Sequence, residues 1–344
     1  MCTPVDKDDR LPDFAPLLPH VKAREWHVDP QKGYTVRQIK PGIFVITDGG
    51  YQALFVATGA GVVLFDAPPS CGAHIIQAVA DVTAEPVVKL VYSHGHVDHI
   101  SGAGLMLQQN PEIEIIAEEG VARFLFDQND PHRPMPTRVF TKHERLTLGS
   151  MTADLRVGYW HSPPGDLFIH LPEEKVLMAV DTMSSGSVPF MGLDLTMNMH
   201  AYLKIFDQML SYDFDFLVPG HHSNPSTRDD AKRVGEYVGD VYATVKRIHE
   251  SDHTSLSSRA AQKYGRDNSY AIARTIIDAE VAQAAKEVKD RWVTKLVGVD
   301  VWAESHCRTA LVYFEWDVGP RPAGAPTATE RRWPGGLRRS YADG

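Results

Sequence analysis

The spacing of apolar residues changes along the chain, and each change predicts a different kind of structure. Four short β-rich runs are separated by turns that contain Gly or Pro, which predicts an antiparallel meander. These runs cover residues 35–39, 43–47, 53–58 and 61–65. From residue 227 to about 316 the pattern is almost entirely helical, with one long amphipathic candidate at 269–296.

Between these two regions, strand-like and helical segments alternate. Helices are predicted at 74–82, 105–109, 118–126 and 201–211. Strands are predicted at 87–92, 113–117 and 214–218, with β-pairs at 144–157 and 167–180. Two successive halves of this kind favour an α/β fold, in which two sheets pack together and helices cover the outer faces.

The same patterns predict how the chain is divided. Residues 1–32 are polar and interrupted by proline, so they are expected to form an arm over the surface. Residues 33–226 form the predicted catalytic core, and 227–317 a helical extension packed on that core. Residues 318–344 are rich in Pro, Gly and Arg and are expected to form a disordered tail.

The composition of the chain limits the kinds of partner that the protein is expected to bind. The chain has 344 residues, 43% of them hydrophobic, and a net charge of −9. This charge argues against a nucleic-acid surface and leaves a small-molecule substrate. Three widely spaced cysteines argue against a disulfide framework. Since no apolar leader and no long apolar stretch occurs, we predict a cytoplasmic protein that does not contact a membrane.

The densest chemistry lies in Ser93-His94-Gly95-His96-Val97-Asp98-His99, which follows the predicted strand 87–92. Alternate residues of an extended loop point the same way, so His94 and His96 can reach one metal ion together. Asp98 and His99 lie one step further and can serve a second ion. Imidazole and carboxylate ligands suit zinc, and also iron or manganese.

Three later positions repeat one arrangement, a polar ligand at the exit of an apolar strand. They are His161, Asp181 and His221. A rigid strand end holds such a side chain in fixed geometry, so these residues are candidates to complete the site.

In this order, His94-x-His96-x-Asp98-His99, His161, Asp181 and His221 resemble the signature of the metallo-β-lactamase superfamily over residues 34–225. The resemblance implies a four-layer αββα sandwich, here with an added C-terminal helical region, and two metals between the sheets. It also implies the sharing of ligands. One metal would be held by His94, His96 and His161, the other by Asp98, His99 and His221, with Asp181 bridging. The strand before Asp66 is similar as well, so Asp66 is expected to support the metal loop from behind the ligands.

This sequence departs from several branches of the family, and these departures reduce the number of reactions that the site is expected to catalyse. Asp181 differs from the cysteine ligand of the best-known zinc β-lactamases, and His96 from the glutamate of the di-iron oxygen reductases. The turn after His161 also differs from that of the glyoxalase II type. We therefore predict two Zn²⁺ ions per chain and a hydroxide activated by both, with Asp98 as the catalytic group, acting on a lactone or carboxylic ester. The alternatives are an iron-dependent sulfur dioxygenase, a thioester, sulfate or phosphate ester hydrolase, and a weak β-lactamase.

Substrate contacts are expected from residues 182–199, which lack periodicity and are apolar. The candidates are Val188, Phe190, Met191, Leu193 and Met197. Core packing is the competing interpretation of the same residues. The C-terminal helices are predicted either to cap this pocket or to form a homodimer contact.

Overall fold

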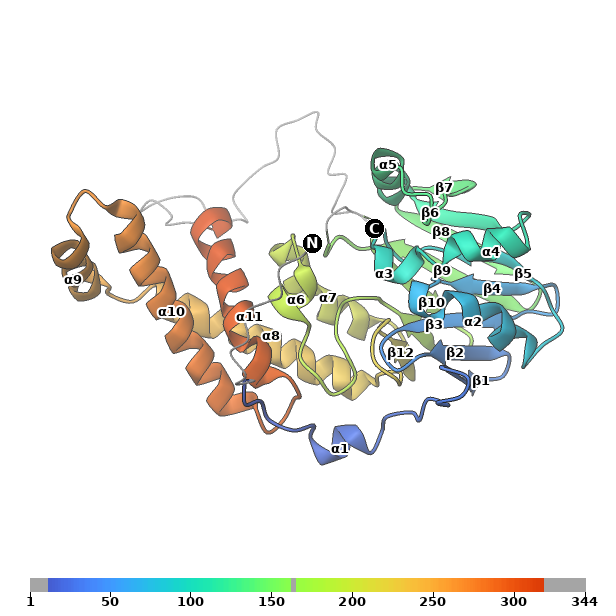
Figure 1. Cartoon of the computed structure of the whole chain (residues 1–344), viewed down its shortest axis with the longest axis horizontal. Helices are drawn as coiled ribbons and strands as arrows, with labels where there is room; N and C mark the ends of the chain where they lie inside the picture. The colour runs from blue at the N-terminus through green and yellow to red at the C-terminus, as the bar shows by residue number, and fades with distance from the viewer. Residues whose placement is uncertain (1–11, 162–164, 319–344) are drawn as a thin grey trace, which may run out of the picture.

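The computed structural model describes residues 12–161 and 165–318. Two β-sheets pack against each other near one end of the molecule (Figure 1). The first has seven strands in sequential order: β1 Thr35–Lys40, β2 Ile43–Thr47, β3 Gln52–Ala57, β4 Val62–Phe65, β5 Val87–Val91, β6 Glu114–Glu118 and β7 Arg138–Phe140. Its first four strands form the predicted antiparallel meander, and β4 to β7 run parallel.

The second sheet has five strands in the order β12-β11-β10-β9-β8. They are β8 His143–Leu148, β9 Met151–Val157, β10 Leu167–Leu171, β11 Val176–Met178 and β12 Phe216–Val218. All neighbours are antiparallel except β11 and β12, which run parallel. Because of this pairing, the carboxyl ends of β11 and β12 lie at the same edge of the sheet.

Strand periodicity explains the layers, because successive side chains point to opposite faces of a sheet. In β3, Leu54 and Val56 are buried between the two sheets, whereas Ala53 and Phe55 are buried under the outer helices. These outer helices are α2 Pro69–Ala80, α3 Val97–Ile100, α4 Ala103–Gln109 and α5 Glu119–Gln128. The predicted αββα sandwich is therefore confirmed.

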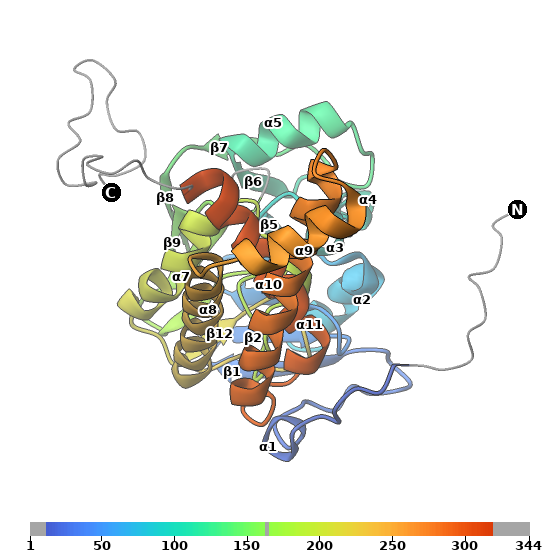
Figure 2. The ribbon, with the colours of Figure 1, turned by 90° about the vertical axis from the view of Figure 1, so that its left-hand side faces the viewer.

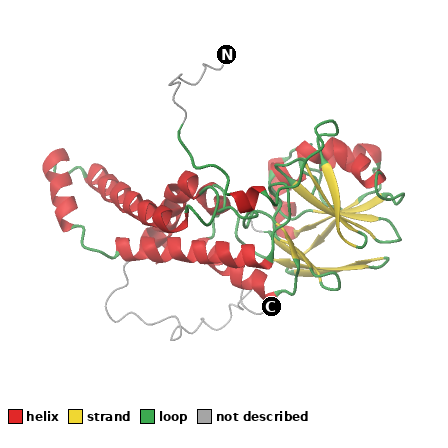
Figure 3. Cartoon of the chain, turned by 90° about the horizontal axis from the view of Figure 1, so that it is seen from below, coloured by secondary structure: helices red, strands yellow, loops and turns green. Residues whose placement is uncertain are grey.

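The helices that follow β11 in the chain cover the outer face of the second sheet and extend away from it (Figures 2 and 3). They are α6 Met191–Leu195, α7 Met199–Ser211, α8 Arg228–His249, α9 Thr254–Tyr264, α10 Ser269–Trp292, α11 Val299–Tyr313 and the π-helical turn η1 Phe314–Val318. Leu177 and Leu217 of the sheet share one apolar core with these helices. Among the described residues, no helix has both the length and the apolar content needed to cross a membrane.

Some details differ from the sequence-based expectations. Strand β7 was not predicted, because three residues are too few to show periodicity. Helix α10 ends at Trp292, so the predicted helix 269–296 is too long at its end. The N-terminal arm contains a short helix, α1 Pro19–Lys22, and Arg24 pairs with Asp230 of α8 at 2.5 Å. The predicted tail lies outside the described residues apart from its first residue, as do residues 1–11 of the arm.

Candidate metal centre

The histidine-rich loop leaves the carboxyl end of β5 and ends in the short helix α3. Buried groups fix it from both sides. The backbone N–H of Ser93 donates to Asp66 Oδ1 at 2.7 Å. From the opposite side, the buried Arg133 donates to the carbonyl oxygen of Gly95 at 2.7 Å. The loop therefore presents its imidazoles from a fixed backbone.

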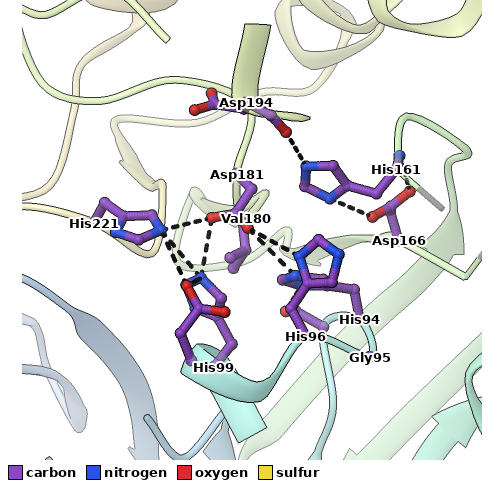
Figure 4. A network of polar contacts seen from close by, with 12 residues as sticks. His94, Gly95, His96, His99, His161, Asp166, Val180, Asp181, Asp194 and His221 are labelled. Atoms are coloured by element: carbon purple, nitrogen blue, oxygen red, sulfur yellow. Dashed lines mark hydrogen bonds and ion pairs between the residues drawn. The ribbon is translucent and has the colours of Figure 1, made fainter. Parts of the chain in front are cut away.

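Asp181 lies between two clusters of potential ligands (Figure 4). In each cluster the ligand atoms lie within 4.8 Å of one another. The first cluster is His94, His96, His161 and Asp181, and the second is Asp98, His99 and His221. Oδ2 of Asp181 lies 3.3 Å from His94 Nε2 and 3.7 Å from His96 Nδ1. Oδ1 faces the second cluster, 3.0 Å from His99 Nε2 and 2.9 Å from His221 Nε2.

The backbone of Asp181 explains how one carboxylate reaches both clusters. It follows β11 and has a positive φ of 55°, a left-handed conformation that Asp tolerates better than most residues. Its N–H donates to the carbonyl oxygen of Pro219 at 3.1 Å, which ties this turn to the turn before His221. Asp66 also has a positive φ, of 64°. Such conformations gather at functional sites, where the surrounding structure holds them in place.

His161 is held by a carboxylate from its own loop. Asp166 Oδ2 accepts the backbone N–H groups of Trp160 and His161, at 2.8 and 2.9 Å. Asp166 Oδ1 lies 3.1 Å from His161 Nδ1. The opposite nitrogen, Nε2, faces the first cluster and lies 2.5 Å from the carbonyl oxygen of Asp194, to which it donates while it is protonated. A metal bound at Nε2 would replace that proton and this hydrogen bond.

Burial and charge act against each other in the site. Burial lowers the pKa of His94 to about 4. It also opposes protonation of His99, but Asp181 and then Asp98 outweigh it and raise the pKa of His99 to about 9. His161 behaves like His99, because Asp166 outweighs burial and raises its pKa to about 9. The pKa of Asp181 lies well below its usual value despite burial, since His99 and His221 favour its charged form.

Five imidazoles and two carboxylates fit divalent zinc, iron or manganese. His94 Nε2 is buried and makes no hydrogen bond within the described residues, as expected of an atom that faces a cation. The structure brings all seven predicted ligands together. Their sharing between two metals stays a prediction.

The other predicted site residues lie in different surroundings. Asp66 is buried, and burial raises its pKa to about 6. Its carboxylate accepts the backbone N–H of Ser93, at the start of the metal loop that it is predicted to support. In the predicted substrate segment, Val188 and Leu193 are buried in the core of the helical layer, as core packing would have it, and their predicted contact with substrate stays untested. Phe190, Met191 and Met197 are exposed; their predicted role stays untested.

Several described residues that contribute to the site were missed from the sequence. Asp166, Arg133 and Asp194 are described above. Another, Gln52, is buried and donates to the carbonyl oxygens of His221, His222 and Asn224 at 2.8–3.0 Å. Only Asp166 had a usable signal, because it lies in the His161-Ser162-Pro163-Pro164-Gly165-Asp166 turn, five residues after the ligand.

Comparison with known proteins adds family information. The model of the metallo-beta-lactamase superfamily matches residues 46–234, more than half of the chain. No curated protein matches. A metallo-beta-lactamase from Pontibacter korlensis is similar in structure, with a TM-score of 0.52 and 15% identity over 59% of this chain and 99% of that one. The metallo-beta-lactamase IND-7 has a TM-score of 0.50 and 17% identity over 59% and 98%.

A third structure is similar over more of this chain. The stereoselective inverting sec-alkylsulfatase Pisa1 from a Pseudomonas species has a TM-score of 0.55 and 15% identity. The match covers 88% of this chain and 56% of that one. At such identities these likenesses show the fold alone.

Proposed function

Because the chain belongs to the metallo-beta-lactamase superfamily, we propose that this metal-dependent hydrolase holds two zinc ions and cleaves a small ester. A lactone or another carboxylic ester is the favoured substrate. One observation carries the proposal: Asp181 directs one carboxylate oxygen at each of the two clusters. A carboxylate placed in this way is suited to fixing the distance between two ions.

When bound, two divalent ions held by these clusters would lower the pKa of a water molecule and polarise a carbonyl oxygen. The protein supplies the proton transfer. Asp98 Oδ2 lies 3.6 Å from His99 Nε2, and its side chain is partly open to solvent. Asp98 would orient the attacking water and take one of its protons. The water oxygen forms the new C–O bond at the acyl carbon while the π electrons of the carbonyl group move onto its oxygen. When the C=O bond re-forms, the C–O bond to the leaving group breaks and the departing alkoxide receives that proton.

Exposure indicates the side from which a substrate approaches. His94, His99 and His161 are buried, whereas His96, Asp98 and His221 are partly exposed. The reacting ester therefore enters over Asp98 and its exposed neighbours. On this side, the carboxylate can reach both the water and the leaving group.

Sulfate ester hydrolysis is the second candidate. The likeness to the sec-alkylsulfatase covers 88% of the chain, against 59% for the two metallo-beta-lactamases. The shared architecture therefore extends beyond the part that the lactamases match. This favours a sulfate ester over a β-lactam as the alternative substrate.

Metal analysis and a substrate panel test the proposal. We expect two zinc ions per chain after purification without added metal, and turnover of lactones or aryl esters in a panel with thioesters, sulfate esters, phosphate esters and a β-lactam. One iron per chain with oxygen consumption would instead support the sulfur dioxygenase alternative. Turnover of sulfate esters alone would make the second candidate the function.

Asp98→Asn tests the catalytic role. The variant should fold and lose turnover by about 100-fold or more, since a positioned acid–base group contributes about that much. Asp290→Asn is the matched control, because Asp290 is exposed on α10 and pairs with Lys286 there. An unchanged kcat in metal-replete Asp98→Asn protein would remove Asp98 from the mechanism.

We also propose that the partner of this site is a small molecule and that the C-terminal helices form a homodimer contact. Light scattering at increasing protein concentration tests the second point. A monomer at all concentrations would contradict it.

A further inference from the structure

Residues 190–197, which link the second sheet to α7, adopt an unusual backbone. Gly192, Leu193, Asp194 and Leu195 form a left-handed turn with φ of 65°, 59°, 54° and 56°. This conformation is unfavourable for the three non-glycine residues, because Cβ approaches the following carbonyl oxygen. Such a turn persists only where neighbouring groups hold it.

Helix α11 holds the turn from one side. Ser305 Oγ accepts the N–H of Gly192 at 2.8 Å. His306 Nε2 donates to the carbonyl oxygen of Phe190 at 2.9 Å, and the Tyr237 hydroxyl donates to His306 Nδ1 at 2.7 Å. Because His306 is fully buried, these bonds are shielded from water. The segment is therefore a preformed surface held by contacts to α8 and α11.

The other side of the segment lies against the metal centre. The carbonyl oxygen of Asp194 is 2.5 Å from His161 Nε2. Two residues later, the Thr196 hydroxyl donates to the carbonyl oxygen of Trp160 at 2.6 Å. The segment therefore begins at α11 and ends at the wall of the first cluster.

The backbone of residues 190–197 places some of its large side chains inside the protein and leaves others in solvent. Leu193 and Asp194 point inward and are buried, and Asp194 is the only charged residue of the segment. Four apolar side chains remain in solvent: Phe190 is 54% exposed, Met191 44%, Leu195 47% and Met197 76%. We call these four residues the apolar strip. Phe190 also packs on Trp302 of α11, with ring centroids 4.8 Å apart.

We propose that the apolar strip binds the hydrocarbon chain of an amphiphilic ester while the ester group reacts at the metal centre. The inference rests on the proposed function and names its substrate class. Two observations point to this occupant. Leu195 and Met197 of the strip each follow directly after a residue, Asp194 or Thr196, that contacts the loop of His161, so the strip lies next to the first cluster. It also offers no exposed charge, which suits an uncharged chain better than a charged peptide. Large apolar side chains that stay exposed together usually mark a binding surface.

Chain-length dependence is the direct test. For 4-nitrophenyl esters from acetate to decanoate, kcat/KM should rise about twofold to fourfold per methylene, since each buried methylene is worth up to about fourfold in binding. Met197→Gln and the double variant Leu195→Asn/Met197→Gln should flatten this slope. Asparagine tolerates the left-handed conformation of residue 195. Tyr270→Ser, at a 90% exposed tyrosine on α10, is the control and should keep the slope.

A binding measurement separates this inference from the proposed function. By calorimetry, the zinc-loaded protein should bind decanoate at least about tenfold more tightly than butanoate, and Met197→Gln should reduce that ratio. If no ester is cleaved but decanoate still binds more tightly than butanoate, the proposed function is wrong, whereas the binding of a hydrocarbon chain to the strip is supported. If esters are cleaved with no chain-length slope, or with a slope that both variants leave unchanged, the inference is overturned. Self-association that Met197→Gln abolishes, without any slope, would assign the strip to a second copy of the chain and also overturn it.

Discussion

The two clusters of the metal centre share Asp181 but differ in their surroundings. In the first, the His94 and His161 side chains are only 2% and 1% exposed, and His96 is 24% exposed. In the second, His99 is buried, but Asp98 is 35% and His221 29% exposed. A carboxylate, Asp166, supports the first cluster. The second is supported through the backbone that follows His221, which Gln52 holds.

This difference indicates a division of labour. A largely buried cluster in which one imidazole is oriented by a carboxylate is suited to holding an ion tightly, because the supporting group fixes the ring and raises its basicity. A cluster with exposed ligands leaves room for water and substrate. We therefore expect the first cluster to bind its metal more tightly and the second to carry the exchangeable positions.

Asp181→Asn should have the largest effect, because it removes the charge that both clusters share. The variant is expected to lose most of both metals, and turnover should fall on the order of a thousandfold, as for loss of a central electrostatic group. Metal content per chain and kcat check this. Retention of two metals would show that the clusters do not depend on a common carboxylate.

Asp166→Asn should weaken metal binding at one cluster and leave the other unchanged. Asparagine keeps the size of the side chain but loses the charge that favours a proton on His161 Nδ1. Affinity for one metal should fall about 10- to 100-fold, the usual cost of removing such a partner, while the other metal is retained. Competition with a chromophoric chelator measures the two affinities. Equal weakening of both metals would contradict the assignment of Asp166 to the first cluster.

The ligands and the sandwich could be predicted for the same reason. Each ligand follows an apolar strand, and the strands carry a period of two that divides residues such as Leu54 and Phe55 between two faces. Both signals are local in the sequence. Strand β7 was missed because it is too short to carry any period.

The supports of the site depend on contacts between distant residues. Asp194 reaches His161 in a turn whose Gly192 is held by Ser305, 113 residues later. A polar residue such as Gln52, at the start of a strand, gives no sign of which carbonyl groups it will meet. For the same reason, the sequence does not distinguish Val188 and Leu193, which the helical layer buries, from their exposed neighbours.

Gln52→Met should weaken the second cluster alone. Methionine fills the same space but cannot donate to the carbonyl oxygens of His221, His222 and Asn224. We expect about a tenfold loss of affinity for one metal, at the lower end of the range for supporting groups because the change acts through the backbone. The metal lost should be the one that Asp166→Asn retains. In the double variant, both affinities should fall.

Of these properties, the response to pH is the one in which we expect the two clusters to differ least. Each contains one histidine whose pKa is raised from 6.5 to about 9, His161 in the first and His99 in the second. A pKa that is higher in the folded than in the unfolded state stabilises the metal-free fold fully below about pH 6.5 and loses that effect as pH rises through about 9. Unfolding of chelator-treated protein should therefore need less urea at pH 9 than at pH 6.5.

Asp166→Asn should reduce this pH dependence of stability and leave the part due to His99. Because a metal must displace the proton of each histidine, both apparent affinities should rise with pH, by up to about tenfold per unit below pH 9. The ratio of the two affinities should then stay nearly constant from pH 6.5 to 9. A ratio that changes steeply would show that the protons are unevenly shared, and that the clusters differ in charge as well as in exposure.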